Sequence, residues 1–115
     1  QHKAEVRPLH AAAGTSAVVS QQLEQGNQLF AQQDWAGAQQ VYLATIQADQ
    51  TLAEAHYNLA LTLERLGEKA EARKHYVAAA NLAPGNKVIW DAPPLRKYDR
   101  ELGLDRKSWM DANPK

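Results

Sequence analysis

Apolar residues between positions 15 and 86 recur every three or four residues, which is the spacing of one face of an α-helix. The pattern breaks near Asp34, at 49–51, at Gly67 and at a Pro-Gly pair at 84–85, so it predicts four helices. The positions that define the four faces are Val19, Leu23, Gly26 and Phe30; Ala38, Val41, Tyr42 and Ile46; Leu52, Ala55, Leu59, Leu63 and Leu66; and Ala72, Tyr76, Ala79 and Ala80. The fold class predicted from this pattern is all-α.

Several predicted helix ends carry residues with capping chemistry. Thr15 or Ser16, and Asp34, can each accept a backbone N–H at the start of a helix. Residues 51–54 (Thr-Leu-Ala-Glu) have the form of a capping box at the start of the third helix. Gly67 suits the left-handed conformation that often ends a helix.

The two helix pairs are related to each other. Residues 19–52 can be laid over residues 53–86 without a gap, at a shift of 34 residues. Small residues recur where two helices must approach closely, and a tyrosine recurs where a gap must be filled. The matched pairs are Gly26 with Ala60, Leu29 with Leu63, Ala38 with Ala72, and Tyr42 with Tyr76. A helix–turn–helix unit of this length is typical of one class of helical solenoid.

Both units resemble the tetratricopeptide repeat (TPR) in the residue types at its fixed places. In the second unit only the first of these places is a poor match, and the places hold His56, Leu59, Ala60, Leu63, Ala72, Tyr76, Ala79 and Pro84. The first unit matches less well, with Gln22, Gln25, Gly26, Leu29, Ala38, Tyr42, Thr45 and Gln50, but its run from Gly26 to Tyr42 is similar to the first repeat of many family members. The resemblance implies an α-solenoid of two TPR helix-turn-helix units.

A third unit begins and then stops. Trp90 stands at the aromatic place of a third first helix, but Pro93 and Pro94 follow where a helix interior is needed. A proline there costs about 3 kcal/mol. We therefore expect the third unit to abort near Asp91 and a new helix to begin at Pro94, since proline is tolerated in a first turn.

The chain divides accordingly into three parts. We expect a flexible N-terminal lead-in (1–14), a TPR domain (15–103) and a C-terminal tail (104–115). Within the TPR domain, residues 87–103 are expected to form a helical cap over the fourth helix, because two repeats alone leave one face uncovered. Cover by a second copy of the chain or by another protein stays open as the alternative.

Charge and composition exclude several classes of protein. Thirteen basic and thirteen acidic residues cancel, which argues against a nucleic-acid or anionic-membrane binder. No apolar run is long enough to predict a transmembrane segment, and the absence of cysteine excludes disulfides and thiolate metal sites. The chain carries no catalytic motif, so we expect no enzyme activity, no cofactor and no metal. Its first residue is Gln1, which predicts a processed or trimmed chain and leaves export and a cytoplasmic location equally open.

The resemblance implies a binding surface, because the first helix of each TPR lines a concave groove. The groove positions fall at Leu23, Asn27, Phe30, Ala31, Tyr57, Asn58, Leu61, Glu64 and Arg65, with Lys87 and Trp90 at the far end. Amide side chains at Asn27 and Asn58 can hold a peptide backbone through both donor and acceptor, and apolar neighbours would select side chains. We therefore predict an adaptor that binds an extended or helical peptide segment of another protein.

Two other functions are compatible with a TPR chain. The repeats could form a structural or self-associating module, as a homo-oligomer or part of a longer solenoid. Co-chaperones of the family grip a C-terminal carboxylate with two asparagines and three basic residues, but the basic places here hold Leu23, Val88 and Ala92. We therefore expect no carboxylate clamp. The chain is also similar to short bacterial repeat proteins that serve envelope or secretion assemblies.

Overall fold

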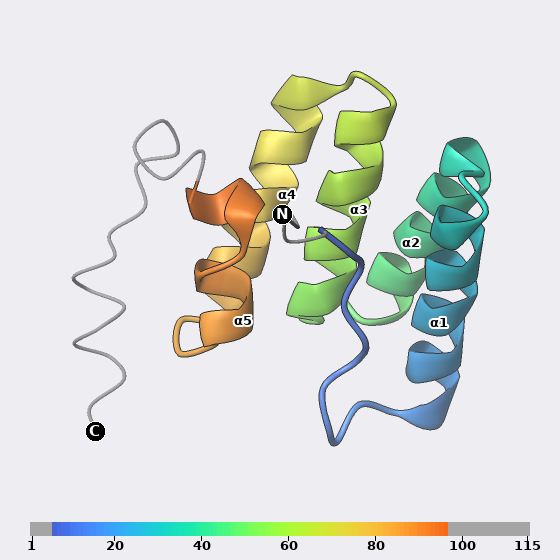
Figure 1. Cartoon of the computed structure of the whole chain (residues 1–115). Coiled ribbons are helices and arrows are strands. Elements are labelled where there is room, and N and C mark those ends of the chain that lie inside the picture. The colour runs from blue at the N-terminus through green and yellow to red at the C-terminus, as the bar shows by residue number, and fades with distance from the viewer. Residues whose placement is uncertain (1–5, 97–115) are drawn as a thin grey trace, which may run out of the picture.

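The computed structural model describes residues 6–96, and within them the chain folds into helices that stack as antiparallel pairs (Figure 1). The first pair packs on the second through α2 and α3, and a short helix follows the second pair. The elements are α1 (Ala17–Ala31), α2 (Trp35–Ala48), α3 (Ala53–Arg65), α4 (Lys69–Leu82) and α5 (Lys87–Trp90). The predicted all-α solenoid of two helix pairs is confirmed.

Three of the expected helix ends form as the sequence indicates. The Ser16 hydroxyl accepts the Val19 N–H at 3.2 Å at the start of α1, and the Asp34 carboxylate accepts the Gly37 N–H at 3.0 Å at the start of α2. Gly67 follows α3 with a φ of +83°, which a residue with a side chain rarely adopts. Each pair is therefore closed by a short turn that holds its two helices antiparallel.

The prediction of a capping box at residues 51–54 is wrong. The Thr51 hydroxyl donates to the Asp49 carboxylate at 2.8 Å, and the Thr51 N–H donates to the same oxygen at 3.1 Å. Leu52 occupies the N-cap position of α3, and no side chain caps the helix there. The local turn formed by Asp49 thus competes successfully for the threonine hydroxyl.

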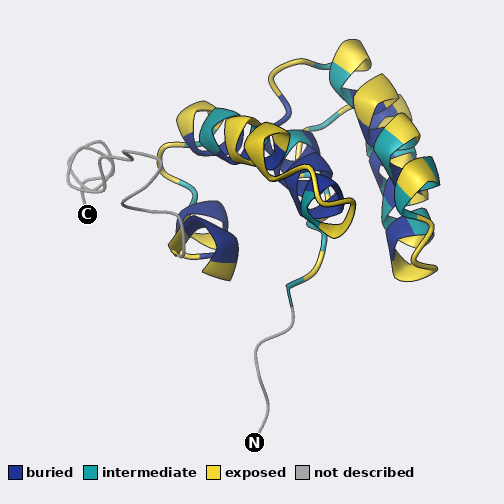
Figure 2. Ribbon diagram, turned by 90° about the horizontal axis from the view of Figure 1, so that it is seen from above, coloured by how far each residue is buried: buried dark blue, intermediate teal, exposed yellow. Residues whose placement is uncertain are grey.

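The repeated small and large residues pack together in the core of each pair. Ala38, Tyr42, Ala72, Tyr76 and Ala60 are all almost completely buried. In the first pair the Tyr42 ring lies so close to α1 that a Cβ atom added at Gly26 would sit 2.5 Å from it. The 34-residue repeat therefore marks the positions where helices approach most closely. In Figure 2 the helix sides that face a neighbour are buried and the outer sides exposed.

Residues 6–11 differ from the flexible lead-in expected over 1–14. They run across α1 and α3, and the side chains of Val6, Leu9 and Ala11 pack half-buried on the core (Figure 1). A turn then leads into α1, with the Thr15 N–H donating to the Ala12 carbonyl at 3.2 Å. This segment is held by its backbone and by three apolar side chains. The flexibility of the lead-in 1–14 as a whole stays a prediction.

The far end of the second pair is covered by the residues after α4. Ile89, Trp90 and Leu95 are buried there, and the Trp90 indole N–H donates to the Ala83 carbonyl at 2.9 Å. Helix α5 ends at Trp90, and residues 93–96 are helical again. The cap expected over 87–103 is described only as far as residue 96; its remainder and the tail 104–115 lie outside the described residues.

Two histidines meet between α3 and α4. The Nδ1 atoms of His56 and His75 are 3.0 Å apart, and the rings stack with centroids 5.2 Å apart. The Nε2 atom of His56 lies 3.2 Å from the Gln50 carbonyl, which can only accept a hydrogen bond. Burial lowers the pKa of the His75 imidazole, and the neighbouring His56 and Lys74 lower it further, against an opposing effect of Glu71. The surroundings of His75 therefore favour its neutral form.

This pair predicts that the protein loses stability in mild acid. Because the pKa of folded His75 lies below that of the unfolded chain, about 6.5, the unfolded state binds more protons as pH falls. The free energy of unfolding should be highest above pH 6.5 and should decrease below it. Urea titrations between pH 7.5 and 5 measure this fall, which His75→Gln should reduce and His10→Gln should leave in place. An equal fall in H75Q and the parent chain would contradict the prediction.

The contact between Gly26 and Tyr42 predicts an unusual result for a helical glycine. Alanine normally stabilises a helix interior by about 1 kcal/mol relative to glycine. Here the added Cβ would overlap the Tyr42 ring, so Gly26→Ala should lower the free energy of unfolding by about 1–3 kcal/mol. In a Tyr42→Leu background the same substitution should no longer destabilise. A higher melting temperature for G26A alone would show that the two helices are not in close contact at this point.

Candidate functional site

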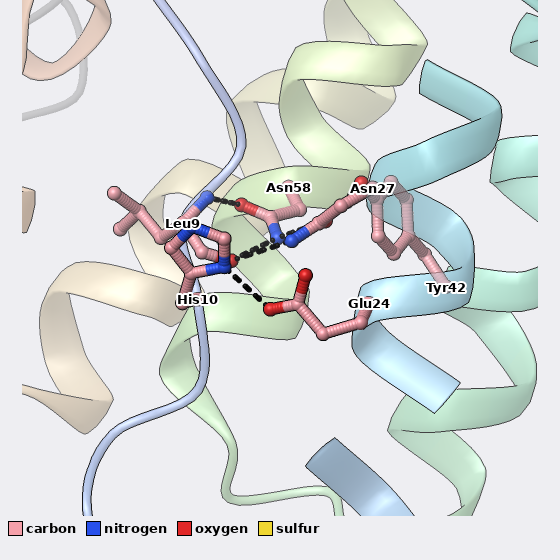
Figure 3. A network of polar contacts seen from close by, with 6 residues as sticks. All are labelled: Leu9, His10, Glu24, Asn27, Tyr42 and Asn58. Carbon is pink, nitrogen blue, oxygen red and sulfur yellow. Dashed lines mark hydrogen bonds and ion pairs between the residues drawn. The ribbon is translucent and has the colours of Figure 1, made fainter. Parts of the chain in front are cut away.

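Two asparagine side chains lie together on the surface formed by α1 and α3 (Figure 3). The Asn58 amide donates to Oδ1 of Asn27 at 3.0 Å, and the Tyr42 hydroxyl donates to the same oxygen at 2.6 Å. These two bonds fix the orientation of the Asn27 side chain, so that its NH₂ group faces the segment at residues 6–11. The resulting surface presents a fixed set of amide donors and acceptors.

The backbone of Leu9 satisfies this set of amides. The Leu9 N–H donates to Oδ1 of Asn58 at 2.7 Å, and Nδ2 of Asn58 donates back to the Leu9 carbonyl at 2.9 Å. The Asn27 amide donates to the same carbonyl at 3.1 Å. Every one of these bonds is made to main-chain atoms, which every residue other than proline offers alike. We call Asn27 and Asn58 the amide clamp.

Burial explains why Asn58 needs a peptide backbone beside it. Its side chain has no exposed surface, although both ends of the amide require hydrogen-bond partners. Leaving a buried donor or acceptor without a partner costs about 1–3 kcal/mol. Leu9, 49 positions away in the sequence, supplies both a donor and an acceptor. The site is therefore organised around a segment in extended conformation.

The tyrosine beneath the clamp is a permanent hydrogen-bond donor. Burial raises the pKa of the Tyr42 hydroxyl above its usual range, and the charge of Glu24 raises it further. Burial likewise raises the pKa of Tyr57, with an added effect of Glu64, and the Tyr57 ring meets that of Tyr76 edge to face with centroids 5.8 Å apart. Since Tyr42 stays protonated near neutral pH, the orientation of Asn27 does not change with pH there.

An ion pair lies beside the clamp at the edge of the groove. The His10 ring contacts the Glu24 carboxylate, and both side chains are largely open to solvent (Figure 3). Exposed pairs of this kind contribute at most about 1 kcal/mol. Glu24 is therefore a minor contact that favours a basic or donor side chain next to the clamped residue.

A cavity of about 490 Å³ opens at one end of the clamp. Two aromatic rings form part of its wall, with Phe30 and Trp35 meeting edge to face at a centroid distance of 4.8 Å. The Arg65 guanidinium lies 5.3 Å from the Trp35 ring centre and 5.9 Å from that of Phe30. The other residues that line the cavity are Val6, Arg7, Pro8, His10, Asn27, Ala31 and Gln33. Such a wall can take an apolar side chain, an aromatic ring or a carboxylate.

The structure places the predicted groove residues in two groups. The first group lies at the clamp and the cavity: Asn27 and Asn58 form the clamp, and Phe30 and Arg65 line the cavity. Leu61 lines a second, smaller cavity, together with Arg65 and the proline pair at 93–94. The second group is almost completely buried: Leu23, Tyr57 and Trp90. Trp90 donates to Ala83 and covers the end of α4, away from the clamp. Ala31 lines the larger cavity, Glu64 lines the smaller one, and Lys87 is exposed on α5. The groove role of all eleven residues stays a prediction.

Three residues that contribute to the site were not among the predicted ones. Tyr42 was assigned to packing alone, although its hydroxyl orients Asn27. Trp35 begins the second helix of its pair, and neither Trp35 nor Glu24 is among the groove positions that the resemblance implies. The sequence signal for Tyr42 was present in the repeat, but the direction of a hydroxyl cannot be inferred from spacing.

Within positions 6–96, no three side chains of His, Cys, Asp or Glu lie close enough to hold a metal ion. None of the helices in that range combines the length and the apolarity needed to cross a membrane.

Comparison with protein families identifies the repeats. A model described as TPR repeat matches residues 26–67, and one described as tetratricopeptide repeat matches residues 53–86, the limits of the second unit. Together the two matches span more than half of the chain. Comparison with curated proteins and with solved structures finds no match. The chain therefore belongs to the tetratricopeptide repeat family, whose repeats serve as protein–protein interaction modules and are typically not catalytic.

Proposed function

We propose that this protein is a non-enzymatic adaptor that binds an extended segment of a partner protein on the surface of α1 and α3. The observation that carries the proposal is the buried Asn58 side chain, whose donor and acceptor are both satisfied by the backbone of one residue. A side chain that is buried and paired in this way is suited to hold a peptide in a fixed position.

The direction of these bonds favours an extended partner over a helical one. In an α-helix the N–H and C=O groups are already bonded to each other, so they are not free to pair with an amide side chain. The clamp needs one N–H and one C=O from the same residue on the same side, which an extended backbone offers. The partner segment is therefore extended where it meets Asn27 and Asn58.

Selectivity would come from the cavity beside the clamp. The clamp itself contacts only main-chain atoms and cannot distinguish one sequence from another. The wall formed by Phe30, Trp35 and Arg65 offers two aromatic surfaces and one positive charge. A partner with an aromatic, apolar or acidic side chain next to the clamped residue would bind better than one without.

Substitution of the clamp tests the proposal. In a chain that carries Leu9→Pro, which weakens the chain's own hold on the clamp, the double variant Asn27→Ala/Asn58→Ala removes every amide contact to the bound backbone. Partner binding should then weaken by about tenfold or more relative to L9P alone, as expected when hydrogen bonds worth about 1 kcal/mol each are lost together. The partner is first captured from the source cell with the parent chain and identified by mass spectrometry. Its affinity is then measured with purified proteins by calorimetry.

The matched control is Asn81→Ala, which removes an exposed asparagine from α4 and should not change the affinity. Circular dichroism must show the same helix content in all chains. If the folded double variant binds the partner as well as L9P alone does, the partner site lies elsewhere on the molecule.

A further inference from the structure

The segment at residues 6–11 is bound in the groove in the manner expected of a partner peptide. It is extended, its Leu9 backbone holds both ends of the Asn58 amide, and Asn27 contacts the same carbonyl (Figure 3). A partner that uses the amide clamp needs these same donors and acceptors. The chain's own segment and a partner therefore cannot occupy the clamp at the same time.

The fit of this segment is incomplete. Its apolar side chains Val6 and Leu9, three positions apart, are only half-buried on the core. A cavity remains open between the segment and the helices: Phe30, Trp35 and Arg65 line it on the helix side, and residues 6–8 and His10 of the segment complete its lining. A competing segment that makes the same backbone bonds and also fills this cavity would bury more apolar surface and would bind more tightly.

The connection to α1 is short and well defined. The Thr15 N–H and hydroxyl both bond to the Ala12 carbonyl, at 3.2 and 2.7 Å, and Gly14 has a φ of +93°. Because only this turn separates the segment from α1, the segment stays near the clamp at an effective concentration on the order of millimolar. A free segment of the same sequence would therefore compete poorly.

We propose that residues 6–11 are a tethered ligand of the amide clamp, which a partner must displace in order to bind. The inference rests on the proposed function and adds the chemistry of the partner. That partner is an extended segment with apolar side chains three positions apart, as Val6 and Leu9 are, and with a further side chain that fills the cavity.

The test uses a fluorescently labelled peptide with the sequence of residues 6–12 and the full-length chain. Leu9→Pro removes the N–H that donates to Asn58, while every residue of the clamp and the cavity is retained. The affinity of the labelled peptide for L9P should be at least about tenfold higher than its affinity for the parent chain, because the tethered competitor is weakened. Fluorescence anisotropy measures both affinities.

Ala13→Pro is the matched control. It also introduces proline before α1, but outside the segment, at the second position of the turn at 12–15, where proline fits when glycine follows with a positive φ. A13P should bind the peptide as weakly as the parent chain. Adding Asn58→Ala to L9P should abolish the binding gained.

Equal affinity of the peptide for the parent chain, L9P and A13P, or no binding to folded L9P, would overturn the inference. So would a parent chain that is dimeric by light scattering and becomes monomeric in L9P, because the segment would then occupy a second copy. If L9P does not fold, Val6→Ser/Leu9→Ser replaces it, since all backbone N–H groups are kept. Loss of partner binding in N27A/N58A together with an unchanged peptide affinity in L9P would leave the proposed function standing and remove only the tethered ligand.

Discussion

The Tyr42 side chain links the core of the first helix pair to the groove. Its ring lies against Gly26 so closely that no side chain fits between them, and this contact sets the distance between α1 and α2. Its hydroxyl donates a hydrogen bond to Oδ1 of Asn27, and the same oxygen accepts a second hydrogen bond from the Asn58 amide of the next pair. Packing within one repeat therefore determines how the amide groups of two repeats face a bound backbone.

The two repeats use the same tyrosine differently. Tyr76 occupies the place of Tyr42 in the second pair and is equally buried, but its hydroxyl donates to the Glu64 carboxylate at 2.7 Å. The ring thus performs the same packing task in both repeats, whereas the hydroxyl orients a clamp residue only in the first. A repeat protein can in this way keep one architecture while its groove changes from repeat to repeat.

Much of the fold could be predicted from the sequence because it depends on spacing. The helices, the 34-residue repeat, the caps at Ser16 and Asp34 and the glycine at 67 all follow from apolar periodicity and local backbone chemistry. The capping box failed because Asp49 and Thr51 are neighbours, and spacing does not show which of two local bonds wins. Asn27 and Asn58 could be identified as groove positions only through the family resemblance, and their shared contact with Leu9 could not be foreseen. The apolar residues at 6–11 follow no helical or strand period, and a hydrogen bond made by the backbone does not depend on the residue type, so the sequence does not indicate it.

The aromatic wall of the cavity and the amide clamp use different side chains, and this has a consequence for the evolution of such a protein. Changes at Phe30, Trp35 or Arg65 would alter which side chains are preferred without disturbing the bonds that hold the backbone. A duplicated gene could thus acquire a new binding specificity through very few substitutions. In the proposed binding mode, the same arrangement would give protein engineers a scaffold whose specificity can be changed while the backbone contacts are kept.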